Sequence, residues 1–219
     1  MSQAKFAVIA LAVLAGVAGV QADIIWDNYL TSPDGYDSIS AFTSERNTNV
    51  VDSWAGDDAI FGAPVTVTGV EWLAIRDPDY QYTAEVVVLD ENFDIVNEYI
   101  EMDYAATVVT PDPLFGYQVY SGYIDLGGLD LPAGQYYFAV RLFTGGAGRN
   151  MILTTGDGTI NGLSMGVVQS DHFGIANWTE IASAWPGAPV TDLAYRIHGV
   201  PEPASLVLLA GGLFMLRRR

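Results

Sequence analysis

The chain contains no cysteine, which excludes disulfide bonds, thiolate metal ligands and a catalytic thiol. Histidine occurs only at His172 and His198, and two histidines without a paired spacing do not indicate a zinc site. Gly162-Leu163-Ser164-Met165-Gly166 has the Gly-x-Ser-x-Gly spacing of the α/β-hydrolase elbow, but that elbow joins a strand to a helix, and no helical pattern follows it here. We therefore predict that the protein is not an enzyme. Its fold must depend on a hydrophobic core or on bound cations.

Positive charge is equally scarce. Residues 23–200 hold 25 of the 26 acidic residues but only five basic ones, all arginine, so this segment has a net charge of about −20. Such a surface repels nucleic acid and anionic lipid, and we exclude nucleic-acid binding on this ground. It favours cations, and it keeps an exported protein soluble.

Long hydrophobic runs are confined to the two ends of the chain. Lys5 precedes an apolar stretch from Phe6 to Val20, which is followed by Val20-Gln21-Ala22 with small residues at the −3 and −1 positions. This pattern predicts a secretory signal peptide over residues 1–22, cleaved between Ala22 and Asp23. The alternative is a retained N-terminal anchor helix.

The C-terminal run has three parts: Pro201-Glu202-Pro203, an uncharged segment over 204–216, and Arg217-Arg218-Arg219. The prolines favour an extended, accessible backbone around Glu202. A spanning helix needs about 20 residues, so the predicted helix over 204–216 is a weak anchor. The arginines should stay on the cytoplasmic side. Such a weak anchor suits temporary attachment to the membrane. The alternative is an ordinary C-terminal tail anchor.

This three-part tail resembles the PEP-CTERM sorting signal of exopolysaccharide-producing Gram-negative bacteria. Pro201, Glu202 and Pro203 match the signature, residues 204–216 the hydrophobic segment, and Arg217, Arg218 and Arg219 the basic end. The resemblance implies recognition by an exosortase-type transpeptidase or protease. Together with signal peptidase and the export machinery, that enzyme would deliver the protein to the cell envelope or extracellular matrix after a transient stay at the inner membrane.

Between the two signals, short runs rich in β-branched and aromatic residues recur between Gly, Pro, Asn and Asp, with almost no helical periodicity. We predict strands at 65–75, 82–89, 95–101, 117–126, 135–143, 151–154, 164–168 and 192–197. They indicate an all-β fold, an antiparallel β-sandwich domain over residues 23–199 that is jelly-roll-like rather than immunoglobulin-like. Pro111-Asp112-Pro113 is expected to mark a loop. The tail, residues 200–219, follows the domain.

Four segments inside this domain carry a further resemblance to the same family. Residues 44–47, 53–61, 68–72 and 192–197 look like stretches found in extracellular β-sandwich domains of PEP-CTERM proteins. Ala59-Ile60 departs from the commoner residues after the paired aspartates. Because most such proteins have no assigned activity, this likeness bears on fold and location and not on chemistry.

Acidic pairs raise the possibility of a structural calcium ion. Ca²⁺ takes 6–8 oxygen ligands, often from irregular loops, and Asp57-Asp58 is the best candidate pair. The alternative is that aspartates occupy turns or bond to the backbone, as they commonly do.

Aromatic residues suggest a second kind of site. Sugars stack on exposed aromatic rings, and Trp178 and Trp185 lie near glycines and prolines expected in loops, which makes them candidates for glycan binding. Core packing is the alternative for both, and it is the expected role of Trp72 within its predicted strand.

Together these patterns predict an exported protein with a structural or adhesive role in exopolysaccharide or biofilm. Two alternatives stay open. A secreted glycan-active hydrolase would need two facing carboxylates in a groove, whereas a passive surface-coat protein would need neither a groove nor an aromatic face.

Overall fold

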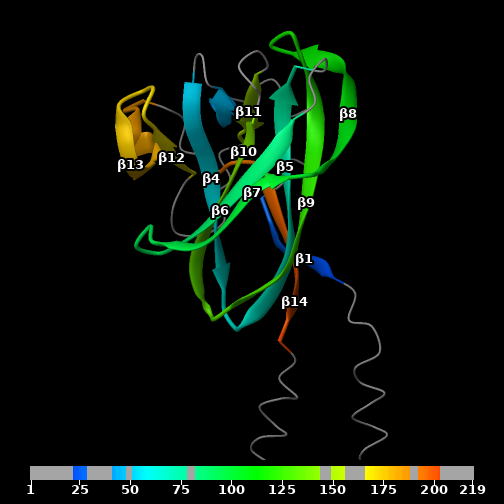
Figure 1. Cartoon of the computed structure of the whole chain (residues 1–219), viewed down its shortest axis with the longest axis vertical. Helices are drawn as coiled ribbons and strands as arrows, with labels where there is room; N and C mark the ends of the chain where they lie inside the picture. The colour runs from blue at the N-terminus through cyan, green and yellow to red at the C-terminus, as the bar shows by residue number, and fades with distance from the viewer. Residues whose placement is uncertain are drawn as a thin grey trace, which may run out of the picture.

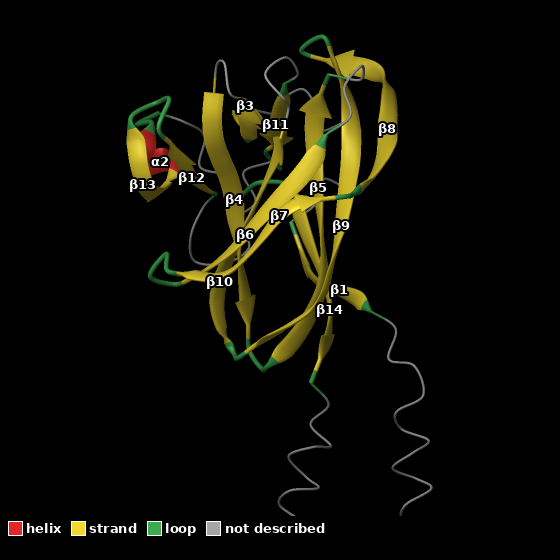
Figure 2. Ribbon diagram, in the orientation of Figure 1, coloured by secondary structure: helices red, strands yellow, loops and turns green. Residues whose placement is uncertain are grey.

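The computed structural model describes residues 22–28, 41–47, 51–77, 82–143, 149–155, 166–187 and 192–202, which are almost entirely β-structure (Figure 2). The one helix among them, α2 (Ile181–Ala184), has four residues. None of the described helical structure is long and apolar enough to cross a membrane. Most of the predicted signal peptide and the predicted helix over 204–216 lie outside the described residues.

The first of two sheets contains the strands nearest the ends of the described chain. Its order is β1 (Asp23–Asp27), β14 (Tyr195–Pro201), β5 (Val65–Arg76), β11 (Asn150–Leu153) and β2 (Ala41–Thr43), with β9 (Tyr117–Leu131) paired to β5 and β8 (Ala105–Leu114) paired to β9. The long β5–β9 pairing, from Val65 opposite Leu131 to Arg76 opposite Gln118, forms the middle of this sheet.

The second sheet packs against the first and carries the candidate site. Its order is β13 (Ile175–Glu180), β12 (Val167–Ser170), β4 (Val51–Phe61), β3 (Glu45–Asn47), β10 (Gly134–Phe143), β6 (Thr83–Asp90) and β7 (Ile95–Met102). β4 also pairs directly with β10. In Figure 1, β4, β5 and β9 run along the long axis of the molecule, whereas β6 and β7 cross it obliquely.

The all-β sandwich predicted from the sequence is confirmed. Successive strands lie in different sheets at β2–β3, β4–β5, β5–β6, β7–β8, β9–β10, β10–β11, β11–β12 and β13–β14, so the chain passes repeatedly from one layer to the other. The pairing is antiparallel except between β3 and β10, which run parallel through Leu142 opposite Glu45 and Phe143 opposite Arg46. Here β3 occupies the space that opens where β4 and β10 diverge.

Apolar side chains from both sheets fill the space between them. Trp72 is 1% exposed, which confirms its predicted core position. It lies opposite Gly122 on β9, where an added Cβ would sit 2.3 Å from the indole ring. The glycine is therefore needed for the close approach of the indole to β9.

Two segments differ from the sequence prediction. Pro111-Asp112-Pro113 was expected in a loop, but it lies within β8. β8 is an edge strand, where a missing N–H removes no ladder hydrogen bond, and this explains why prolines are tolerated there. Asp57-Asp58, expected in a turn, in a loop or at the start of a strand, lies in the middle of the eleven-residue strand β4.

The two ends of the described chain lie side by side. β1 pairs with β14, with Asp23 opposite Gly199, and the N–H of Glu202 donates to the carbonyl of Pro64 at 3.1 Å. Figure 1 shows both ends leaving the same end of the sandwich. Ala22 and Asp23, and also Pro201 and Glu202, are exposed there.

Candidate functional site

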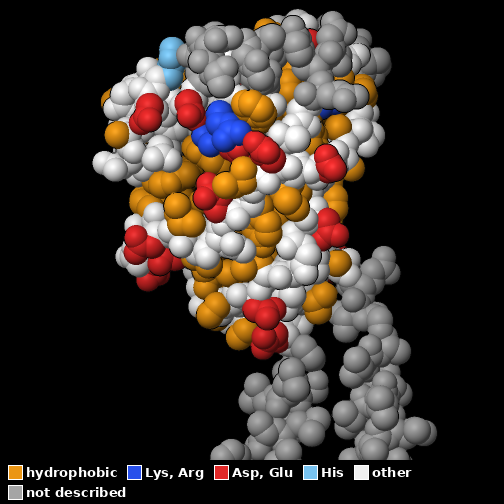
Figure 3. All heavy atoms as spheres, in the orientation of Figure 1, with side chains coloured by type: hydrophobic (Ala, Val, Ile, Leu, Met, Phe, Trp, Pro, Cys, Tyr) orange, Lys and Arg blue, Asp and Glu red, His pale blue; other side chains and the backbone are white. Residues whose placement is uncertain are grey.

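A polar pocket opens on the outer face of the second sheet. Strand register places Gln169 of β12 opposite Trp54 of β4, and Arg141 of β10 opposite Glu85 of β6. Alternation along each strand sends these four side chains to the same face of the sheet. Figure 3 shows this face, where positive charge gathers at one place among acidic and hydrophobic side chains.

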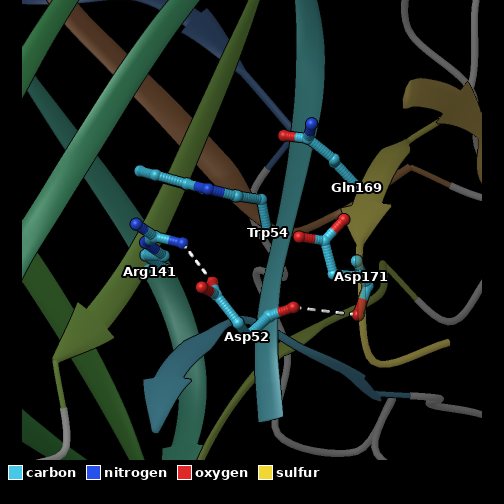
Figure 4. A pocket seen from close by; sticks show the side chains of 6 residues that line it. Asp52, Trp54, Arg141, Gln169 and Asp171 are labelled. Carbon is cyan, nitrogen blue, oxygen red and sulfur yellow. Dashed lines mark hydrogen bonds and ion pairs between the residues drawn. The ribbon is translucent and has the colours of Figure 1, made fainter. Parts of the chain in front are cut away.

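The pocket has a volume of about 110 Å³, and we call it the Trp54–Arg141 pocket. Figure 4 shows side chains of β4 and β10 on one side and those of β12 and the following turn on the other. Its lining residues are Asp52, Trp54, Arg141, Gln169, Ser170 and Asp171. Carboxylate, amide, hydroxyl and guanidinium groups therefore converge beside one indole ring.

Arg141 is fixed in place by three neighbours. Its Nε lies 2.6 Å from Glu85 Oε2, its Nη1 pairs with Asp52, and its guanidinium stacks 4.0 Å from the centre of the Trp54 ring. Glu85 is buried and is also paired with Arg46, whose Nη1 lies 2.8 Å from Oε1. Because Glu85 lies between two arginines, the guanidinium of Arg141 is oriented before any ligand arrives.

Trp54 connects the pocket to an apolar cluster on the same face. Its ring lies 6.3 Å from that of Trp178, and Phe93 covers Tyr137 at 4.9 Å. The buried members of the cluster are Trp54, Val87, Leu89, Tyr137, Ala139 and Val167. Trp178 is half-buried over this cluster and supports the ring that lines the pocket.

Trp185 belongs to a different region. Its ring packs between Phe42 at 5.9 Å and Phe173 at 5.8 Å, at the margin of the core between the sheets. The structure thus places the two predicted glycan-binding tryptophans in separate clusters. Trp178 reaches the pocket through Trp54, whereas Trp185 takes no part in lining it.

Asp57 points into the sandwich and binds backbone and amide groups. Its Oδ2 accepts from Asn28 Nδ2 at 3.0 Å and from the Leu193 N–H at 2.9 Å, while Oδ1 accepts from the Asp58 N–H at 3.0 Å. Burial, and then the charge of Asp192, raise the pKa of Asp57 well above its ordinary value of 3.8. Ca²⁺ binding here would have to displace these hydrogen bonds.

Asp58 lies on the opposite face of β4, as neighbouring strand residues do. Its Oδ2 accepts from Gln135 Nε2 at 2.9 Å. The predicted calcium pair therefore extends in two directions from the strand. In the part of the chain that the structure describes, no group of three acidic or histidine side chains is placed to hold a metal ion.

The two histidines lie in different parts of the fold. His198 is in β14, and its Nε2 lies 3.1 Å from Glu71 Oε2, while the Ser121 hydroxyl donates to Glu71 Oε1 at 2.8 Å. The carboxylate stands between the serine and the histidine, whereas a hydrolase triad needs the histidine next to the nucleophile. His172 lies in the exposed β12–β13 turn beside Phe173.

The predicted sorting motif is only partly described. Pro201 ends β14, Glu202 follows it, and Pro203 and Arg217, Arg218 and Arg219 lie outside the described residues. Ala22 and Asp23, the predicted signal-cleavage residues, lie beside β14 at the same end of the domain.

Most of the pocket is not evident from the sequence. Arg141 is the single basic residue in the apolar run 135–143, and that isolated charge is the one local signal of the site. Asp52, Gln169 and Asp171 carry no pattern of their own, because the pairing of β4 with β12 brings them together. No family model, curated protein or solved structure matches the chain.

Proposed function

We propose that the protein is an exported component of the cell envelope or extracellular matrix, with a structural or adhesive role, that contacts exopolysaccharide through the Trp54–Arg141 pocket. The observation that carries this proposal is the set of groups in the pocket: two carboxylates, an amide, a hydroxyl and a guanidinium beside an indole ring. Sugar hydroxyls both donate and accept hydrogen bonds, so they match such a mixed set. Neutral glycans fit best, because the acidic domain repels anionic polymers.

The tail supports export and sorting. Its three-part pattern resembles the PEP-CTERM signal, and the chain ends of the domain lie together on one exposed end of the sandwich. A precursor with both apolar segments in the inner membrane would therefore be held at this end. Signal peptidase and an exosortase-type enzyme would act at neighbouring positions.

Loss of one pocket carboxylate should weaken glycan binding. We expect Asp171→Asn to raise the Kd for a bound neutral polysaccharide about tenfold, since a hydrogen bond to a charged group contributes about 1.5 kcal/mol. Asp171 is exposed in the β12–β13 turn, so stability should hardly change. Affinity electrophoresis through a panel of soluble neutral polysaccharides measures the effect. Asp94→Asn, an equally conservative change at an exposed residue after β6, is the control; equal retardation of both variants contradicts the proposal.

Processing of the tail is tested separately. Replacing Pro201, Glu202 and Pro203 by alanine should leave the tail attached, because the motif that the enzyme recognises is removed. Intact mass of the protein recovered from exosortase-containing cells reads the C-terminus directly. Recovery of the wild-type protein with Arg217–Arg219 still attached would refute the sorting proposal without bearing on the pocket.

A glycan hydrolase is the second candidate, because Asp52 and Asp171 line one pocket. Binding is favoured over cleavage since a volume of about 110 Å³ is below the ~300 Å³ usual for pockets that enclose a small-molecule ligand. Release of reducing ends from a polysaccharide that the protein retains would favour the hydrolase.

A further inference from the structure

A second pocket lies at the end of the sandwich from which both chain ends leave. Its volume is about 370 Å³, within the ~300–1,000 Å³ usual for pockets that enclose a small-molecule ligand. Most of its lining residues are apolar: Ile24, Ile25, Ile60, Phe61, Ala63 and Val65. Phe61 and Val65 are buried, whereas Ile24 is 41% exposed, so the apolar lining continues from the core to the surface. We call this site the Ile24–Phe61 pocket.

The pocket is built by β1 and by the turn between β4 and β5. β1 contributes Ile24 and Ile25, and the lining residues of β4 and β5 lie on either side of their turn, residues 62–64. That turn is exposed, and residues 59–70 carry no charge. Asp23 is the single charged residue among those that line the pocket. This end of a strongly acidic domain therefore has an almost uncharged, apolar concave surface. Figure 1 shows the β4–β5 turn at the end of the sandwich where β14 leaves it.

The occupant is indicated by the places where the chain leaves the domain. Asp23 and Pro201 both line the pocket. The N-terminal apolar run ends at Val20, three residues before Asp23, and the C-terminal run begins at Ala204, three residues after Pro201. Three residues span at most about 11 Å. When the precursor is anchored as proposed above, the hydrocarbon of the membrane therefore begins close to the pocket.

The charge of the domain favours a zwitterionic lipid. The net charge of about −20 repels anionic headgroups, and Asp23 and Glu202 are exposed at this end. An apolar pocket next to the bilayer gains from contact with hydrocarbon in place of water. We propose that the Ile24–Phe61 pocket takes up an acyl chain of a zwitterionic phospholipid, which holds this end of the domain against the bilayer. This inference rests on the membrane anchoring that is part of the proposed function.

A fluorophore beside the pocket tests this, because the chain has no other thiol. Ala63→Cys in the full chain is labelled with nitrobenzoxadiazole and reconstituted into phosphatidylcholine vesicles, some of whose lipids carry a nitroxide on an acyl chain. Ala133→Cys is the matched control, since Ala133 is also exposed at this end, next to the Gly134–Phe61 pair, but does not line the pocket. We expect at least threefold more nitroxide quenching at position 63. Equal quenching, as a soluble ligand or another protein in the pocket would give, overturns the proposal.

A charge at the edge of the pocket gives a second readout. Ile24→Asp, combined with the label at position 63, should reduce the quenching at least twofold, because the acyl chain would meet a carboxylate. Ile95→Asp, at an exposed isoleucine of β7 that does not line the pocket, should leave the quenching unchanged. Equal quenching in these two variants overturns the acyl-chain site.

Flotation of the same vesicles separates this inference from the proposed function. A chain that floats with the vesicles but shows no excess quenching at position 63 refutes the lipid site alone. A chain that does not float refutes the proposed membrane anchoring together with the lipid site. Glycan binding through the Trp54–Arg141 pocket is measured independently of both.

Discussion

Asp57→Ala should lower the free energy of unfolding by about 3–5 kcal/mol. The substitution leaves three N–H donors without their acceptor, those of Asn28, Leu193 and Asp58, and each buried orphan costs about 1–3 kcal/mol. Relief of the repulsion between Asp57 and Asp192 offsets part of this loss. The donors come from the end of β1, from β4 and from the segment before β14, so the carboxylate connects the two sheets. Urea unfolding followed by tryptophan fluorescence measures the change.

Asp57 also makes the free energy of unfolding depend on pH, with a sign that follows from its raised pKa. The pKa of Asp57 is raised in the folded state, so between about 3.8 and its folded value the native protein binds more protons than the unfolded chain. Its contribution therefore favours folding below the unfolded pKa and is lost as the pH rises through the folded pKa. We expect Asp57→Asn to reduce the gain in stability seen when the pH falls from 7 toward 4. Asp125→Asn, at an exposed aspartate, is the control; an identical pH profile for the two variants contradicts the assignment.

Tyr195→Phe should lower the free energy of unfolding by about 2 kcal/mol. Two buried hydroxyls bridge β4 and β10 here, in place of direct backbone hydrogen bonds between the strands. The Tyr195 hydroxyl donates to the Ala55 carbonyl at 2.8 Å and accepts from the Val140 N–H at 3.1 Å. The Ser44 hydroxyl donates to the Val140 carbonyl at 2.5 Å and accepts from the Ala55 N–H at 2.9 Å. Removing either leaves one buried donor and one buried acceptor unsatisfied.

Ser44→Ala should have a similar effect, and the double variant should reveal coupling above about 0.5 kcal/mol, since both hydroxyls bind the same two residues. Thermal and urea unfolding of the four proteins in the cycle supply the numbers. Tyr117→Phe, at a half-buried tyrosine at the start of β9, should change stability by less than about 0.5 kcal/mol. Strict additivity of the two losses would show that the hydroxyls act separately.

The sequence predicted most of the long strands, but it missed β4, which carries paired aspartates, and β8, which carries two prolines. The run 65–75 became β5 and 135–143 became β10 with shifts of one residue, because both are rich in β-branched and aromatic residues. β4 was missed because Asp57 and Asp58 resemble a turn, although long-range donors stabilise them inside a strand. β8 was not predicted, because Pro111 and Pro113 indicated a loop, although an edge strand tolerates them.

The candidate site was less predictable than the fold for a related reason. Trp178 was singled out because it lies near glycines, yet it supports Trp54, and the polar pocket depends on which strands are neighbours. Local sequence carries no information on the pairing of β12 with β4, which are more than a hundred residues apart. Asp57 and Asp58 were grouped because they are adjacent, whereas adjacency within a strand sends two side chains to opposite faces.

The proposed sorting motif begins within the last strand of the folded domain, with no linker before it. Pro201 is still paired with Val65, and Glu202 is held by the Pro64 carbonyl. An enzyme that binds this motif must either accommodate the folded domain next to its active site or separate the last residues of β14 from β5 before it cleaves. In the proposed processing, the folded domain would therefore limit access to the cleavage point, and the rate of tail removal would depend on how readily the end of β14 separates from β5.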